Sequence, residues 1–457
     1  MGVDINLFRK EKGGDPELVR KSEIARNRNP EQLKKVDEIV EKDEKWRKTL
    51  FQKDQLAKEF NRLNKEIGKV KKEGGDWESI VAEADKIKLE KEVLEKEEGV
   101  IFTDLQVNLK SIGNLVHESV LVDNNEDNNP VVRKWGTIPD IVVNNTPGKA
   151  CHHHVLEMIG GYDPKRGQRI AGHRGFFLKG MGAMLNIALV NYGLAFLNQR
   201  SYTPMHTPFF MKKSVMAETC QLSDFDDQLY KVSTGKDSEV GEDNESYLIA
   251  TSEQPISAYF LNEVIERSEL PIRFAGFSTC FRKEAGAHGK DTWGVFRVHQ
   301  FEKIEQFVIT SPEDSWAEHE KMITVSEEFY QSLGLPYRIV NIVSGALNDA
   351  AAKKYDLEAW FPGYNTYREL VSCSNCTDFQ SRGLNIRMST KKGEKDGKNG
   401  PEYVHMLNST LTATERTLCC ILENYQTEKG VVVPKVLIPY VGVDFIPYIT
   451  TDVFKTE

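Results

Sequence analysis

A chain of 457 residues with 39% hydrophobic and 28% charged residues has the composition of a folded globular protein, which excludes a disordered one. Its length exceeds that of one common hydrophobic core, so we expect two or three domains. The formal net charge of -9 argues against a protein that coats nucleic acid nonspecifically, because such binding relies on neutralising phosphates. Binding of RNA through one confined basic surface is compatible with this charge.

The sequence predicts a cytoplasmic protein without a membrane segment. Its apolar runs fall well short of the roughly eighteen residues that cross a bilayer. No basic segment followed by an apolar core stands near the first residues, so no secretion signal is indicated. The seven cysteines are an odd number scattered along the chain, which suits reduced thiols in a reducing compartment.

Two helices joined by a tight reversal are predicted near the N-terminus. In the first helix, apolar positions alternate steps of four and three at Leu56, Phe60, Leu63, Ile67 and Val70. In the second, apolar residues recur at helical spacing at Trp77, Ile80, Ala84, Ile87, Leu94, Ile101, Leu105 and Ile112. Two glycines at 74 and 75 cannot continue a helix at low cost, so the chain reverses there. We therefore expect an antiparallel coiled-coil arm over about residues 29–112, with legs of roughly 60 Å.

The two legs of this arm differ in charge. Residues 31–70 contain eleven Lys or Arg against nine Asp or Glu, whereas residues 76–112 contain five against ten. The first leg is therefore the more basic one. Taken alone, such charges most often only solvate a helix surface, so the rest of the chain must decide whether this leg binds RNA.

Three parts of the chain are predicted: an N-terminal domain over residues 1–120 that includes the arm, a linker over 121–148, and a second domain over 149–457. The linker is polar and rich in Asn and other turn-forming residues. After it, a helix from Met184 to Arg200 precedes short β-type runs that are interrupted by further helices. This pattern predicts an α+β fold whose sheet is mainly antiparallel and flanked by helices.

A predicted strand, a glycine-rich loop and a second strand carry the charged residues that most strongly suggest chemistry. Side chains alternate across a strand, so Arg282 and Glu284 share one face of the first strand. One face of the second strand holds Arg297, His299, Phe301, Lys303 and Glu305. The simpler alternative is the solvated face of an ordinary hairpin. An isolated Phe301 between charged groups favours instead a platform for a flat ring.

Two further strand-like pieces and a helix add groups that nucleotide activation requires. One piece begins at Glu369, the other ends at Thr410, and a helix from about Leu411 to Gln426 holds Arg416. Arginines offer fixed positive charge to phosphates, while carboxylates can bind Mg²⁺ or an ammonium group. The set therefore predicts a site that activates a substrate with ATP.

These segments resemble the three signature motifs of class II aminoacyl-tRNA synthetases. Motif 1 is similar to the helix that precedes residues 202–208, motif 2 to FRKE at 281–284, and motif 3 to TATER at 412–416. Within that class, the seryl-tRNA synthetases are closely similar to TSEQP at 251–255, RVHQFEKIE at 297–305 and ELVSCS at 369–374. The resemblance covers nearly the whole chain, so residues 149–457 are expected to form a class II catalytic domain. Residues around 373–376 are similar to the eukaryotic cytosolic branch.

The resemblance implies which residues bind ATP. Arg282 is expected to hold the α-phosphate and the serine carboxylate, and Glu284 to meet the adenine. Phe301 would stack on the adenine, while Arg416 covers its other face and reaches the γ-phosphate. The other residues assigned to ATP are Lys283, Arg297, Val298, Glu369, Leu370, Val371 and Ser372. Mg²⁺ would enter with ATP and bind at Glu369 and Ser372. The catalytic residues implied by the resemblance are Arg282, Glu369 and Arg416.

The resemblance also implies a serine site and the reaction. Thr251 and Glu305 would take the serine ammonium, and Thr410, with Asn408 near it, the hydroxyl. The site further includes Ser252, Glu253 and Arg282. The implied activity is a two-step ligation, in which serine and ATP form seryl-adenylate and serine then passes to the terminal ribose of tRNA. The implied partners are ATP, L-serine, a serine tRNA whose long variable arm the helical arm grips, a second copy of the chain in a homodimer, and selenocysteine tRNA.

Three alternatives depend on other features of the sequence. Cys373 and Cys376 could suggest a zinc site, but no second such pair or spaced histidine pair accompanies them, so no zinc is expected. A class II synthetase for another amino acid is a rival, although the short stretch after Arg416 leaves no room for the anticodon-binding domain that such enzymes commonly append. A noncatalytic RNA-binding protein that keeps the fold is the second rival.

Overall fold

Two compact units, Gly2–Leu115 and Val116–Glu457, make up the chain in the computed structural model. The structure describes residues 2–220, 227–232, 245–285, 289–390 and 401–455. The N-terminal unit is helical. The C-terminal unit is built on a large sheet and contains the residues that the sequence analysis assigns to ATP and serine.

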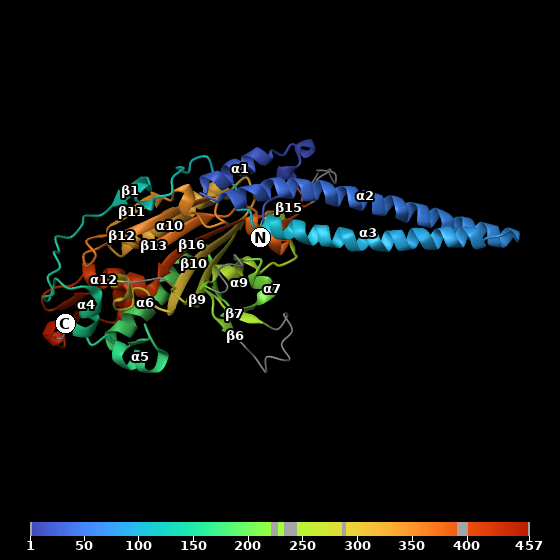
Figure 1. Ribbon diagram of the computed structural model, residues 1–457. Helices are drawn as coiled ribbons and strands as arrows, with labels where there is room; N and C mark the ends of the chain where they lie inside the picture. The colour runs from blue at the N-terminus through green and yellow to red at the C-terminus, as the bar shows by residue number, and fades with distance from the viewer. Residues whose placement is uncertain (1, 221–226, 233–244, 286–288, 391–400, 456–457) are drawn as a thin grey trace. The chain divides into compact units, whose positions relative to one another are not determined.

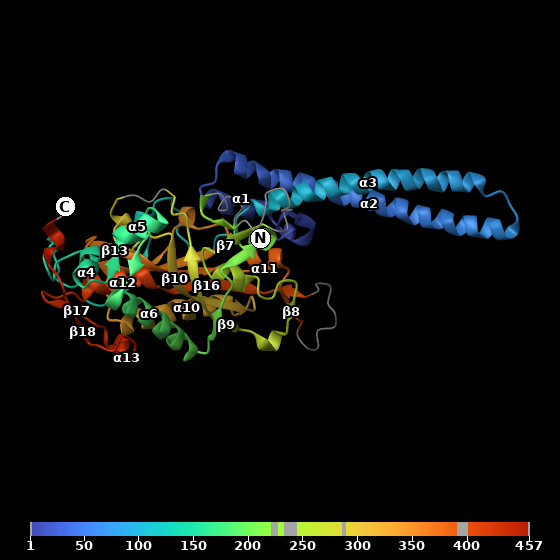
Figure 2. The same cartoon turned by 90° about the horizontal axis from the view of Figure 1, so that it is seen from below.

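The N-terminal unit consists of a short helix α1 (Pro16–Ala25) and two long helices, α2 (Pro30–Glu73) and α3 (Glu78–Lys110). Helix α2 begins at Asn29, whose side chain accepts a hydrogen bond from the backbone N–H of Gln32 at 2.8 Å, as in a regular N-cap. It ends at Gly74, which adopts the left-handed conformation with φ 72°. The two long helices then run side by side as an antiparallel hairpin (Figures 1 and 2). The predicted helical hairpin is confirmed.

Apolar residues and ion pairs join the two legs of the hairpin. The predicted apolar positions are buried or half-buried between the legs. The ion pairs run from lysines of α2 to acids of α3: Lys42 to Asp104 at 2.7 Å, Lys45 to Glu97 at 3.2 Å and Lys53 to Glu98 at 3.0 Å. Surface ion pairs of this kind contribute little energy each. Each lysine of α2 meets an acid of α3 only when the two helices are aligned in this register, so the pairs favour it over others.

A buried carboxylate fixes the base of α2 to the preceding segment. Asp43 is 1% exposed and accepts hydrogen bonds from Arg9 at 2.6 and 3.0 Å and from Arg47 at 2.9 Å. A buried charge is stable only when it is paired in this way. Asp43 therefore ties α2 to the N-terminal residues of the same unit.

An eight-stranded sheet forms the centre of the C-terminal unit. The strand order is β1-β11-β12-β13-β16-β10-β9-β4, and every neighbouring pair is antiparallel except β4 and β9. The strand bounds are β1 Val131–Trp135, β4 Thr203–His206, β9 Ile272–Phe281, β10 Gln300–Thr310, β11 Tyr337–Asn341, β12 Lys353–Phe361, β13 Thr366–Asn375 and β16 His405–Ala413. Strand β1 lies within residues 121–148, the stretch that the sequence analysis describes as a linker. The predicted α+β fold with a mainly antiparallel sheet is confirmed.

Helices cover one face of this sheet, and shorter elements lie around it. On β10, Glu302, Ile304 and Gln306 point toward helices α6, α10 and α12 and contact them or their core residues. The longer helices are α6 Gly180–Asn198, α10 Ser315–Ser332 and α12 Thr414–Asn424; the shorter ones are α4 His152–Met158, α5 Pro164–Ala171, α7 Lys213–Met216, α9 Glu253–Ser257, α11 Phe379–Leu384 and α13 Ile438–Val441. The small strands are β2 Tyr162–Asp163, β3 Phe177–Leu178, β5 Phe210–Lys212, β6 Lys231–Val232, β7 Ser246–Leu248, β8 Val264–Ile265, β14 Arg387–Met388, β15 Glu402–Tyr403, β17 Gly430–Val432 and β18 Phe445–Pro447.

Helix α6 is the only helix in the described part of the chain that is long and apolar enough to cross a membrane, judged by length and composition alone. Its Leu185, Leu189 and Leu197 are fully buried in the main core of the C-terminal unit. Packing on the sheet therefore accounts for much of its apolar character.

The predicted helix from Leu411 starts too early. Residues up to Ala413 belong to strand β16, and α12 begins at Thr414. The strand is longer because Lys303 to Thr310 of β10 pair with it as far as Ala413. Arg416 consequently lies in the first turn of α12, directly after the sheet.

Candidate active site

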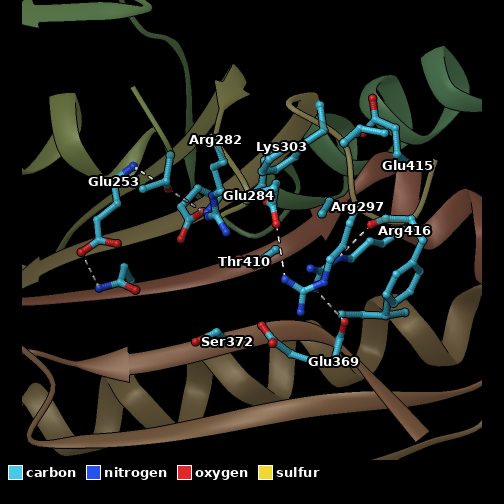
Figure 3. A pocket seen from close by; sticks show the side chains of 18 of the residues that line it. Glu253, Arg282, Glu284, Arg297, Lys303, Glu369, Ser372, Thr410, Glu415 and Arg416 are labelled. Carbon is cyan, nitrogen blue, oxygen red and sulfur yellow. Dashed lines mark hydrogen bonds and ion pairs between the residues drawn. The ribbon is translucent and has the colours of Figure 1, made fainter. Parts of the chain in front are cut away.

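A cavity of about 240 Å³ opens on the face of the sheet that the long helices leave uncovered (Figure 3). Its walls come from β10, β13 and β16, from the starts of α9 and α12, and from the residues that follow β9 and precede β10. These segments are far apart in the sequence, and the sheet order brings them together. The two predicted strands are too long here: β9 ends at Phe281, before Arg282 and Glu284, and β10 begins at Gln300, after Arg297 and His299.

Two β-bulges aim the side chains of β13 and β16 into the cavity. The register of β16 against β10 shifts between Ile304 and Glu305, so that Leu411 is the extra residue and Thr410 stands opposite Glu305. The register of β13 against β12 shifts in the same way around Leu370. Because a bulge reverses the alternation of side chains, Glu369 and Ser372 can both face the cavity.

Arg282 at the end of β9 is held by backbone and by an aromatic ring. Its Nε donates a hydrogen bond to the carbonyl of Ala250 at 3.2 Å, and its guanidinium lies 5.2 Å from the ring centre of Phe301. Both side chains line the cavity, and Figure 3 shows the position of Arg282. An arginine fixed in this way needs little reorganisation to meet an anion.

Arg297 is held by two carboxylates. Its Nη1 donates to Glu284 at 3.3 Å, and its Nε donates to Asp291 at 3.1 Å. Both bonds leave the guanidinium at the cavity wall (Figure 3). Glu284 adopts a left-handed backbone with φ 49°, where the chain turns away from β9.

Arg416 and Glu369 are neighbours at one end of the cavity, where Nη1 of Arg416 donates to the backbone carbonyl of Glu369 at 3.4 Å. The Nε of Arg416 donates to the carbonyl of Phe296 at 3.3 Å, and its guanidinium lies 5.1 Å from the Phe296 ring centre. Burial lowers the pKa of Arg416 from its usual value. Burial also raises the pKa of Glu369, but the positive charges of Arg416, Lys354 and Arg282 outweigh this effect and leave that pKa below its usual value. Glu369 is therefore an ionised carboxylate.

The opposite end of the cavity is lined with acids and hydroxyls. Lys303 and Glu305 form a buried ion pair, and the hydroxyl of Thr251 donates to Glu305 at 3.5 Å. Thr410 faces Glu305 from the neighbouring strand. This end can accept a small ammonium group and can hydrogen-bond a hydroxyl.

Glu253 is a half-buried carboxyl at this acidic end. Burial, together with repulsion from Glu305, raises the pKa of Glu253 to about 7. Its Oε1 accepts hydrogen bonds from the side-chain amides of Gln380 at 2.8 Å and Asn408 at 3.0 Å. The carboxyl thereby orients Asn408 toward the cavity.

Most of the predicted site residues meet in this one cavity. Those that line it are Thr251, Glu253, Arg282, Glu284, Arg297, Val298, Phe301, Glu305, Glu369, Leu370, Ser372, Asn408, Thr410 and Arg416. Three predicted residues do not belong to the described lining. Ser252 and Val371 are fully buried, and the backbone N–H of Lys283 donates to the carbonyl of Gln228 at 3.0 Å.

Several residues of the cavity were not assigned a role from the sequence. Lys303 stood on the predicted polar face, so its strand position was a signal that it neighbours Glu305. Phe296 and Glu415 carried no such signal. Both oxygens of Glu415 accept the backbone N–H of Glu302, at 3.0 and 3.2 Å, and so fasten α12 to β10 beside Phe301 and Arg416. The others are Val295, Asn348, Ser374 and Ala413.

The cavity has two chemically different ends. Arg297 and Arg416 lie at one end, with Arg282 between the two ends, and these guanidinium groups can hold a polyphosphate because they match phosphate oxygens. Carboxylates and hydroxyls at the other end suit a small zwitterion with a hydroxyl. Among the described residues, no three His, Cys, Asp or Glu side chains form a metal-binding group. A metal that enters on phosphate oxygens needs only one or two protein ligands, which Glu369 and Ser372 could supply.

Comparison with known proteins identifies this arrangement. The family model of the tRNA synthetase class II core domain (G, H, P, S and T) matches residues 230–425. The chain is thus a class II aminoacyl-tRNA synthetase. The model of the seryl-tRNA synthetase N-terminal domain matches residues 3–116. The cytoplasmic serine–tRNA ligase of Dictyostelium discoideum is 54% identical over 98% of this chain and 96% of its own. The chain therefore belongs to the seryl-tRNA synthetase family.

Solved structures agree with this assignment. The cytoplasmic serine–tRNA ligase of Naegleria fowleri, solved in complex with AMP, is 48% identical with a TM-score of 0.83 over 98% of this chain and 100% of that one. The seryl-tRNA synthetase of Pyrococcus horikoshii, solved with ATP, is 38% identical with a TM-score of 0.87 over the same shares. The predicted family, its serine–tRNA ligase activity and its cytoplasmic location are confirmed by these relatives.

Proposed function

We propose that the cavity joins L-serine to ATP, with the triphosphate at the arginine end and the amino acid at the acidic end. The observation that carries this proposal is the distribution of charge along one cavity: Arg297 and Arg416 lie toward one side and Glu253 toward the other, with Arg282 between them. In this arrangement the α-phosphate of ATP and the carboxylate of serine lie next to each other in the middle of the cavity. Arg282 then binds both.

Each nucleotide contact has a side chain of suitable chemistry. Phe301 stacks on the adenine, and Arg416 covers the other face and reaches the γ-phosphate. Arg297 binds a phosphate through the side of its guanidinium that its two carboxylate partners do not occupy. Catalysis then consists of positioning and of positive charge at the α-phosphate, with Arg282, Glu369 and Arg416 as the catalytic residues.

We also propose that Mg²⁺ enters with ATP and is held by Glu369 and Ser372. The carboxylate of Glu369 is ionised at neutral pH because neighbouring cations lower its pKa. Oxygen ligands of this kind suit Mg²⁺, which spreads the charge of the phosphates when it is bound.

The acidic end selects serine because its polar side chains form hydrogen bonds with both the ammonium group and the hydroxyl of that amino acid. Thr251 and Glu305 hold the ammonium, and Thr410 with Asn408 holds the hydroxyl. Alanine would leave the hydroxyl of Thr410 without a partner, and a buried polar group left unpaired disfavours the wrong substrate strongly.

The helical hairpin α2–α3 is the proposed contact for the long variable arm of serine tRNA. Its first leg carries the larger share of Lys and Arg, as phosphate contacts require. Selenocysteine tRNA is a further proposed substrate on the family resemblance. A homodimer is proposed through α6, the motif 1 helix, on which Ile187 is 52% and Met184 39% exposed.

The test is serine-dependent exchange of pyrophosphate into ATP, followed by charging of serine tRNA. The protein should exchange with serine and not with alanine or threonine. Thr410→Val keeps the shape of the side chain and removes its hydroxyl, so it should lower the serine to alanine preference by about 10- to 100-fold. Equal exchange with alanine and serine in the unaltered protein would refute the assignment of the acidic end.

A further inference from the structure

Two residues that do not line the cavity control how Arg297 is presented to it. Arg297 lies three residues before the start of β10, and its Nε donates to Oδ2 of Asp291 at 3.1 Å. The same carboxylate also accepts hydrogen bonds from Nη2 of Arg368, at 2.8 Å on Oδ1 and 2.7 Å on Oδ2. One carboxylate therefore joins two guanidinium groups that would otherwise repel each other.

Arg368 is itself fixed by two aromatic rings. Its guanidinium lies 5.2 Å from the ring centre of Phe296 and 4.9 Å from that of Tyr364. The hydroxyl of Tyr364 donates to the carbonyl of Lys290 at 3.1 Å, one residue before Asp291. Lys290 and Asp291 are thus attached to the turn between β12 and β13 by Tyr364 and to β13 by Arg368.

These contacts determine which edge of Arg297 is available. Its Nε is bound to Asp291 and its Nη1 to Glu284. In the described part of the chain, no acceptor meets Nη2. A guanidinium held on two sides presents its remaining donors in one direction, at the wall of the cavity. Without Asp291, only the 3.3 Å bond to Glu284 would orient this side chain.

We propose that Asp291 and Arg368 are positioning residues for ATP, which act by fixing Arg297 in the orientation that binds a phosphate. The proposal rests on the function assigned above to the arginine end of the cavity. Arg368 acts from outside the cavity by balancing the negative charge of Asp291. Asp291 can therefore orient Arg297 without placing a net negative charge beside the triphosphate.

The substitution Asp291→Asn separates positioning from simple electrostatics, because the two predict opposite signs. If Asp291 were only an anion near the nucleotide, its removal would tighten ATP binding. If it positions Arg297, the amide, a poorer acceptor for two guanidinium groups, should weaken ATP binding. We expect the KM for ATP in serine-dependent exchange to rise on the order of tenfold, with the KM for serine changed less than about twofold.

Arg368→Gln should give the same selective effect, and Asp291→Asn/Arg368→Gln should be little worse than either change alone, because the two residues act as a unit. Lys290→Gln is the matched control, since it removes a positive charge from the neighbouring loop position without touching this network. It should leave the KM for ATP within about twofold. Circular dichroism and the melting temperature establish that each variant is folded.

Three results would overturn the proposal: unchanged or tighter ATP binding in Asp291→Asn, additive effects in the double variant, or an equal rise in the KM for serine. Calorimetric titration with ATP alone gives a second measurement that requires no catalysis. If the unaltered protein bound ATP but showed no serine-dependent exchange, the proposed function would fail, while the calorimetric comparison would still decide the role of Asp291.

Discussion

Replacing Glu253 by glutamine removes a half-buried acid while keeping its shape and an oxygen that can accept from Gln380 and Asn408. The pKa of Glu253 is raised from 4.5 to about 7 in the folded protein, chiefly by burial. A carboxyl with a raised folded pKa contributes stability that is fully present below about pH 4.5 and is lost as the pH rises through about 7. One pKa unit corresponds to about 1.4 kcal/mol, so the total loss is about 3 kcal/mol.

Glutamine does not titrate, so the Glu253→Gln protein lacks this pH dependence. The difference in unfolding free energy between the variant and the unaltered protein should therefore shift by about 2 to 3 kcal/mol in favour of the variant between pH 5 and pH 8. Urea unfolding of both proteins, followed by tryptophan fluorescence, measures this difference at each pH. A constant difference across the range would show that the Glu253 carboxyl titrates alike in the folded and unfolded chain, and the argument from burial would be refuted.

Three further predictions concern the proposed reaction. Arg282→Ala should abolish serine-dependent pyrophosphate exchange without unfolding the protein, because its charge acts where negative charge develops; near-normal exchange would remove Arg282 from this role. Phe301→Leu should weaken ATP binding by about 1 to 3 kcal/mol, the range for aromatic base stacking, measured by calorimetry; unchanged affinity would show that the ring only packs. Deleting residues 58–92 keeps the Lys53–Glu98 pair at the new end of the hairpin and should spare exchange but abolish tRNA charging; normal charging would exclude the hairpin from RNA selection.

Local sequence periodicity predicted the parts of the protein whose structure depends on local spacing. The steps of four and three in α2 gave the buried seam, because a helix repeats its faces at that interval. The alternation of Phe301, Lys303 and Glu305 gave the cavity wall, because a strand repeats every second residue. Both patterns are present in the sequence before any long-range contact forms.

The remaining features depend on contacts between distant residues. The bulges at Leu370 and Leu411 arise from the register between strands, so the sequence alone could not show that Glu369 and Ser372 share a face, or that Thr410 faces Glu305. Arg368 and Asp291 are 77 residues apart, and nothing in either neighbourhood indicates the other. For the same reason the role of Phe296 as a support for Arg416 was not visible.

Because the hairpin is long, a small rotation at its base produces a large displacement of its tip. Helix α2 contains 44 residues, which corresponds to about 66 Å of length. A rotation of about 5° around its base would move its tip by about 6 Å, which is about one turn of an α-helix. The two hydrogen bonds from Arg9 to Asp43 resist that rotation, because they connect α2 to the segment before α1. In the proposed complex with tRNA, the position of the tip would therefore depend on a residue that the RNA does not need to touch.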